Sequence, residues 1–281
     1  YRVWFEEKYQ QRANSWMLMV ASFGFVISTL PVQILLPMIG WRSIFLLISI
    51  LILLSIILIL VFTPSWNNNP KNTTTQEKGN LSDVWKNKFF ISLIPLCFLN
   101  YGGVQAVQTL WAGPWMLNVA GYSPLDSATG LFWINITMLF AFMFWGYILP
   151  KFSSLGIDSI KIVKIGLPIS YVVLFSIIIM GQNAGAIMFT LYILSSIVLS
   201  LTQPALALSF PQNLAGKSLT SINVFIHSGT FFVQWGIGLL IDLSKNMGAS
   251  TVTSYKISFS IFLILCIFSY LFFIYFNKNE N

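Results

Sequence analysis

Eight apolar segments dominate the sequence, and each is long enough to cross a lipid bilayer as a helix. Such a helix needs about 20 mostly apolar residues, because the hydrocarbon core is ~30 Å thick and each residue rises ~1.5 Å. Only 8% of the 281 residues are charged and 56% are hydrophobic. These values exclude a water-soluble globular enzyme and an intrinsically disordered chain. The sequence predicts an all-α polytopic membrane protein of about eight transmembrane helices, at residues 15–37, 42–63, 89–118, 125–149, 159–181, 184–209, 215–241 and 252–276.

Glycine, proline and capping residues mark where these helices begin and end. Gly40 separates the first two segments, and Gly121 follows the third. The fourth begins with Ser123, Pro124 and Asp126. This pattern is typical of an N-cap serine, a proline at the first helical position and an acid that completes a capping box.

A polar stretch at residues 64–88 divides the chain into two segments before it and six after it. Its asparagines, threonines and lysines predict a flexible linker. Of the 15 Lys+Arg, 12 fall on the side of the membrane that holds this linker and both termini, and three fall on the other. Because cytoplasmic loops carry an excess of Lys and Arg, we expect the linker and both termini to be cytoplasmic.

Several motifs carry a resemblance to a known family. Trp4-Phe5 with Arg12-Ala13 precedes the first segment, and Gly40-Trp41-Arg42 with Phe45 begins the second. Further motifs are Leu110-Trp111-Ala112-Gly113-Pro114-Trp115, Gly216-Lys217 with Asn223, and Gln234-Trp235-Gly236-Ile237-Gly238. Together they resemble the fifth to twelfth helices of bacterial major facilitator superfamily transporters, which have twelve spans.

The resemblance implies a division of the chain into three parts. Residues 1–63 would be the last two helices of the N-terminal half, 64–88 the central cytoplasmic linker, and 89–281 the complete six-helix C-terminal half. It also implies that four helices needed for a full transporter precede Tyr1. The family's conserved loop motif would have its second-half counterpart after the fourth segment, where Gly146 to Lys151 keeps the glycine and a base but lacks the acid.

Polar side chains within the segments are the candidate solute contacts, because they are costly in lipid and should face the bundle interior or an aqueous cavity. The fifth and eighth segments are almost purely apolar and are expected to face lipid. The alternative for each polar residue is a hydrogen bond that ties two helices together. The candidates are Asn100, Tyr101, Gln105, Gln108, Asn135, Gln203, Asn223, His227 and Gln234.

The seventh segment is the most informative of these. Asn223, His227, Thr230 and Gln234 follow one another at spacings of four, three and four, which places them on one helical face. His227 is the only histidine. It is either a neutral residue hydrogen-bonded within the bundle or a titratable residue of the cavity.

The absence of catalytic motifs and of carboxylates inside the segments favours transport over catalysis. We expect a secondary transporter in the inner (plasma) membrane that moves a small hydroxylated, amide or weakly charged solute by alternating access, with a proton as a possible coupling ion. No cofactor, metal or nucleic-acid partner is expected; the lipid bilayer is the other partner. The alternatives are a non-transporting remnant or sensor of the same ancestry, and an integral-membrane enzyme.

Overall fold

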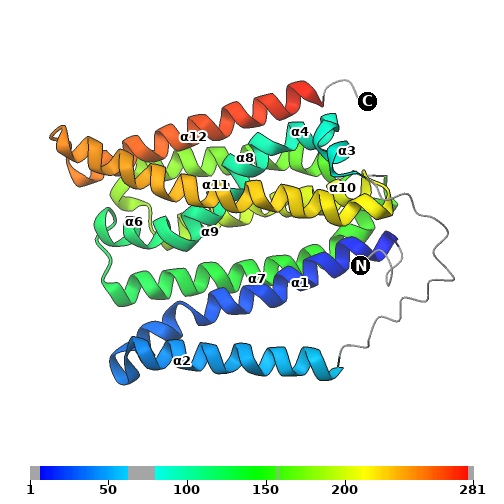
Figure 1. Ribbon diagram of the computed structural model, residues 1–281. Helices are drawn as coiled ribbons and strands as arrows, with labels where there is room; N and C mark the ends of the chain where they lie inside the picture. Colours follow the sequence, from blue (N-terminus) through cyan, green and yellow to red (C-terminus); the bar gives the residue numbers. More distant parts are fainter. Residues whose placement is uncertain (1–6, 63–79, 157, 278–281) are drawn as a thin grey trace.

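A computed structural model describes residues 7–62, 80–156 and 158–277 (Figure 1). Within these ranges every regular element is a helix, so the predicted all-α fold class is confirmed. Seven of the described helices are long and apolar enough to cross a membrane. The chain is therefore a polytopic membrane protein.

The first two predicted spans form α1 (Glu7–Ile27) and α2 (Leu30–Phe62). The predicted span at 15–37 is wrong in its end, because the helix breaks at residues 28–29. Pro31 has no N–H with which to bond the Ile27 carbonyl, and the chain bends there. The predicted break at Gly40 is confirmed by its φ of 74° and ψ of 161°, a conformation open essentially only to glycine.

The predicted flexible linker needs a correction at its C-terminal end. Residues Leu81–Lys86 form a short helix, α3. The Asn80 side chain accepts a hydrogen bond from the Ser82 N–H, and the Asp83 carboxylate accepts one from the Asn80 N–H. This capping box explains the folded segment. Residues 63–79 lie outside the described residues.

The third span is one continuous helical rod, Lys88–Asn118, with two widened turns. In these turns, η1 and η2, the backbone bonds run five residues back, from Gly102 N–H to the Cys97 carbonyl and from Ala112 N–H to the Val107 carbonyl. Such π-helical turns are frequent at functional sites. The rod comprises α4 (Lys88–Pro95), η1 (Leu96–Tyr101), α5 (Gly102–Ala106), η2 (Val107–Trp111) and α6 (Ala112–Asn118).

The remaining helices follow one another along the chain, joined by short turns. The predicted cap of the fourth span is confirmed, since Ser123 Oγ accepts from the Asp126 N–H at 3.1 Å. That helix continues past its predicted end at residue 149. The elements are α7 (Pro124–Ser154), α8 (Ser159–Met180), η3 (Gly181–Asn183), α9 (Ala186–Ser196), η4 (Ile197–Leu201), α10 (Thr202–Leu208), α11 (Gln212–Asn246) and α12 (Thr251–Phe276).

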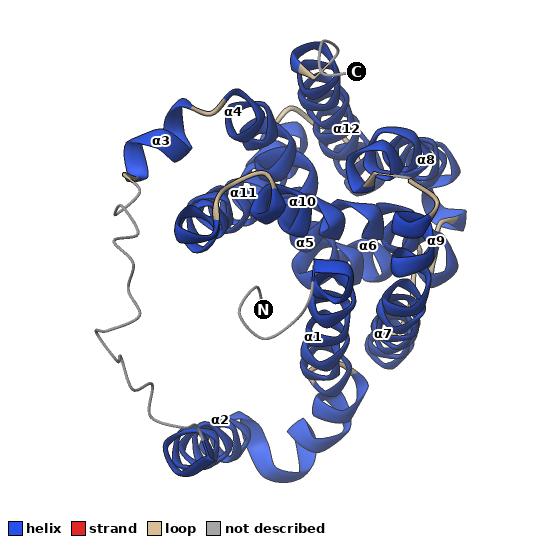
Figure 2. Cartoon of the chain, turned by 90° about the vertical axis from the view of Figure 1, so that its right-hand side faces the viewer, coloured by secondary structure: helices blue, strands red, loops and turns tan. Residues whose placement is uncertain are grey.

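The helices after the linker form a bundle, with α1 packed lengthwise against α7 (Figures 1 and 2). α2 lies apart at the edge, and none of its residues is buried. The rod and α11 cross closely at Gly102, where a Cβ atom would lie 2.6 Å from the Ile226 carbonyl oxygen. The glycine is therefore required for this approach.

Candidate functional site

A cavity of about 90 Å³ lies where α1 meets the bundle. Its walls come from α1, the rod, α7 and the helix formed by α9 and η4. Three of the nine candidate residues, Tyr101, Gln105 and Gln108, line it. The other polar lining residues are Ser22, Ser196 and Ser200, and the apolar ones are Leu18, Ala21, Phe25, Val104, Met138, Phe142, Ile193 and Ile197.

The local structure of the rod presents these three candidates together. Tyr101, Gln105 and Gln108 are four and three residues apart, so they share one helical face. Tyr101 ends the first π-helical turn, and Gln108 lies in the second. Because a π turn accommodates an extra residue, it changes which side chains face the cavity.

Hydrogen bonds hold the side chains of Gln105 and Gln108 in place, but one polar atom of each amide remains unbonded. Gln108 Nε2 donates to Asn135 Oδ1 at 2.7 Å, and Asn135 Nδ2 donates to the Phe25 carbonyl of α1 at 3.3 Å. Gln105 Oε1 accepts from Thr230 Oγ1 at 3.1 Å. Asn135 thus supports the cavity wall from behind. Gln105 Nε2, Gln108 Oε1 and the Tyr101 hydroxyl have no hydrogen-bond partner among the described residues, so the cavity offers both donors and acceptors.

Three serines complete the polar wall, and sequence reasoning missed them as site residues. Each hydroxyl donates to a carbonyl of its own helix: Ser22 to Leu18, Ser196 to Tyr192 and Ser200 to Ile197. This back-bonding is common for serine in membrane helices and gave no reason to expect a contact. The oxygen lone pairs stay available to a ligand as acceptors. The sequence did contain one signal for an irregular helix here. Pro204 has no N–H to bond the carbonyl four residues earlier, and the helix tightens just before it into the turn η4 that carries Ser200.

Asn100 takes the interhelical role. Its Nδ2 donates to Ser269 Oγ at 2.7 Å and to the Cys266 carbonyl at 3.2 Å, and its Oδ1 accepts from the Tyr171 hydroxyl at 2.8 Å. It is 2% exposed and joins the rod to α8 and α12. The structure places it outside the cavity wall.

The polar stripe of α11 is confirmed as one face, and three of its members bond to neighbouring helices. Asn223 Oδ1 accepts from Gln203 Nε2 at 2.8 Å, and Gln234 Nε2 donates to Thr109 Oγ1 at 3.0 Å. Thr230 bonds Gln105 as described above. Gln203, Asn223 and Gln234 therefore link α10 and the rod to α11 and do not line the cavity. His227 is exposed and has no hydrogen-bond partner among the described residues.

A second contact between α1 and α7 lies toward the N-terminal end of α1. Arg12 Nε donates to the Gly146 carbonyl oxygen at 3.1 Å, and its guanidinium lies 5.9 Å from the Tyr147 ring centre. A Cβ atom on Gly146 would lie 2.8 Å from Trp16. The expectation that Gly146 belongs to a loop motif after the fourth span is wrong, because it lies inside α7 at this helix crossing.

Among the residues that the structure describes, none that lines the cavity is Asp, Glu, Lys, Arg or His. Its chemistry is therefore that of neutral hydrogen-bonding groups on an apolar background, which suits binding of a small polar solute.

Comparison with known proteins agrees with this architecture. A sequence model of the Major Facilitator Superfamily matches residues 2–234. No curated protein matches the chain.

Proposed function

The chain belongs to the Major Facilitator Superfamily, a family of membrane transporters, and on that premise we propose that it moves a small polar solute by alternating access. The cavity between α1 and the bundle is the proposed solute site. Tyr101, Gln105 and Gln108 are its proposed contacts, with acceptors from Ser22, Ser196 and Ser200.

The position of the cavity carries this proposal. Alternating access requires a binding site at the interface between two parts that rock against each other. The cavity has α1 on one side and the rod, α7 and α9 on the other. In the proposed division, α1 belongs to the first half and the other three to the second, so a rocking motion would open the cavity.

The lining supports a neutral or weakly charged solute rich in hydroxyl or amide groups. The described part of the wall holds no cationic side chain for a strong anion and no carboxylate for a cation. A cavity of about 90 Å³ holds only a few water molecules. A larger solute therefore requires α1 to move away from the bundle.

Three finer points belong to the same proposal. The first is the division of the chain into residues 1–63, 64–88 and 89–281. The second is its location in the inner membrane, with both termini cytoplasmic. Among the described residues, Arg12, Lys88, Lys151, Lys161 and Lys217 lie toward the expected cytoplasmic ends of their helices. Proton coupling stays a prediction for His227, and His227→Gln, which cannot titrate, would flatten the pH dependence of transport.

A solute screen on the protein expressed from its full coding region tests the proposal. Hydroxylated and amide solutes should raise the thermal unfolding midpoint of the wild type, and a solute that does so should be transported by cells. Gln108→Ala should abolish both effects, because it removes an amide that faces the cavity. Ser258→Ala is the control, since Ser258 is buried in α12 outside the cavity. Stabilisation without transport would indicate a sensor, and stabilisation that survives Gln108→Ala would exclude this cavity.

A further inference from the structure

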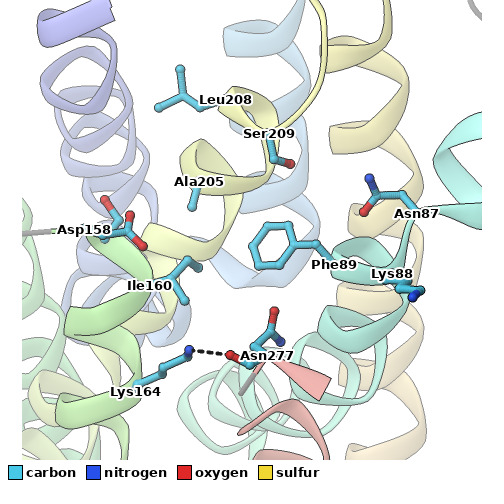
Figure 3. Close-up of a pocket in the computed structure, with 11 residues that line it drawn as sticks. Asn87, Lys88, Phe89, Asp158, Ile160, Lys164, Ala205, Leu208, Ser209 and Asn277 are labelled. Atoms are coloured by element: carbon cyan, nitrogen blue, oxygen red, sulfur yellow. Dashed lines mark hydrogen bonds between the residues drawn. The ribbon is translucent and has the colours of Figure 1, made fainter. Parts of the chain in front are cut away.

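A second and larger cavity, of about 650 Å³, opens at the ends of four spans (Figure 3). It lies beside the first residues of α4 and α8, the last residues of α10 and the residue that follows α12. Because these are the ends of membrane-crossing helices, the cavity lies at the level of the lipid headgroups and not in the hydrocarbon core.

Two lysines give this cavity a positive character. Lys164 is held in place on α8, because the Tyr270 hydroxyl donates to its carbonyl oxygen at 2.6 Å and its own Nζ donates to the Asn277 carbonyl at 3.2 Å. An ammonium group has three donors, so two remain. Lys88 lies at the start of α4 on the opposite wall, exposed on a flexible stem (Figure 3). Asp158 also lines the cavity, so the described lining residues carry a net charge of +1.

Asn277 adds an unused acceptor to the same cavity. Its side chain is 4% exposed, and its Nδ2 donates to Ser92 Oγ and to the Phe273 carbonyl, both at 2.8 Å. Its Oδ1 has no donor among the described residues and points into the cavity (Figure 3). No buried side-chain oxygen or nitrogen among the described residues lacks a partner, so this oxygen is accessible from the cavity and can accept a hydrogen bond from a hydroxyl group there.

From these groups we infer a binding site for an anionic phospholipid whose headgroup carries a phosphate and a free hydroxyl, as phosphatidylglycerol does. The phosphate lies between Lys88 and Lys164, and a headgroup hydroxyl donates to Asn277 Oδ1. The acyl chains leave the cavity along the apolar helix surfaces toward the bilayer. Basic pockets between transmembrane helices bind anionic headgroups in this way.

Native mass spectrometry of the purified full chain in detergent, with added phosphatidylglycerol or phosphatidylcholine, tests this site. Phosphatidylcholine lacks both the net negative charge and the hydroxyl, so the wild type should retain phosphatidylglycerol preferentially. Each of Lys88→Gln and Lys164→Gln should weaken retention about fivefold, as expected for one cation at a lipid phosphate. Lys164→Gln keeps the main-chain carbonyl to which the Tyr270 hydroxyl donates, so this contact between α8 and α12 is preserved.

Lys161→Gln is the matched control, because Lys161 is exposed on the same helix and outside the cavity. It should retain phosphatidylglycerol as the wild type does. Equal retention of the two lipids would overturn the inference, and so would an equal loss in the Lys161 variant, which would indicate general surface attraction. Displacement of the lipid by inorganic phosphate at matched concentration would assign the cavity to free phosphate instead.

Discussion

Asn100 and His227 are both polar side chains within membrane spans, but their surroundings differ. Asn100 is buried and makes three hydrogen bonds to two other helices. His227 is exposed and has no hydrogen-bond partner in the described part of the chain. At the scale of single residues, a polar side chain inside a span can therefore have different roles. Asn100 ties helices together, whereas the His227 imidazole is bonded to no other described group.

This difference predicts unequal effects on stability. Asn100→Ala removes all three hydrogen bonds and leaves the buried Tyr171 hydroxyl with only the longer contact to the Cys266 carbonyl, at 3.4 Å. It should therefore lower the free energy of unfolding by about 1–3 kcal/mol. His227→Ala removes no contact and should change it by less than ~0.5 kcal/mol. Thermal unfolding of the two variants in the same detergent measures the difference. Equal midpoints would show that the Asn100 network does not stabilise the bundle.

The candidate site illustrates what could be predicted from residues and what could not. The α11 stripe followed from spacing alone, because helical periodicity fixes which side chains share a face. Which of those side chains meet a cavity depends on the neighbouring helix. Ser22 and Asn100 could not be sorted in advance, because a serine or asparagine in a span looks the same whether it faces a cavity or another helix.

At the scale of helices, the spans were predictable because their length is set by the bilayer, and Gly40 marked a real break. The π-helical turns η1 and η2 were not predicted, since one extra residue in a turn leaves the hydrophobic pattern almost unchanged. The close crossing of the rod and α11 at Gly102 was visible only in three dimensions, because a glycine in a span does not show which helix approaches it.

The crossing gives a second prediction. Gly102→Ala would place a methyl group 2.6 Å from the Ile226 carbonyl oxygen and 2.7 Å from the Thr230 nitrogen. Backbone atoms cannot move aside without shifting α11, so the variant should lose about 1–3 kcal/mol of stability. Gly236→Ala, on α11 with open space around it, should be neutral or stabilising because alanine favours a helix. The thermal unfolding midpoints of the two variants, each compared with the wild type, test this prediction. A Gly102→Ala variant as stable as the wild type would refute the tight crossing.

For the whole molecule, the charge distribution predicts a fixed orientation in the membrane. Lys161 at the start of α8 and Met247 after α11 are exposed residues at opposite ends of the bundle. In a background with Cys97 and Cys266 replaced by alanine, a membrane-impermeant maleimide added to intact cells should label Met247→Cys and not Lys161→Cys. The reverse pattern would contradict the proposed cytoplasmic location of the termini.

The central claim is that the cavity between α1 and the bundle opens alternately to the two sides of the membrane. Ser22→Cys on α1 and Ser196→Cys on α9 place thiols on opposite walls of that cavity, in the same cysteine-free background. Ser258→Cys is the control, because Ser258 is equally buried, bonds its own helix in the same way and lies outside the cavity.

The decisive measurement is the rate at which an impermeant maleimide labels these thiols in right-side-out and in inverted membrane vesicles. Alternating access predicts that Ser22→Cys and Ser196→Cys react from both sides, while Ser258→Cys reacts from neither. Labelling of the two cavity positions from one side only, or at the rate of the Ser258 control, would contradict the account.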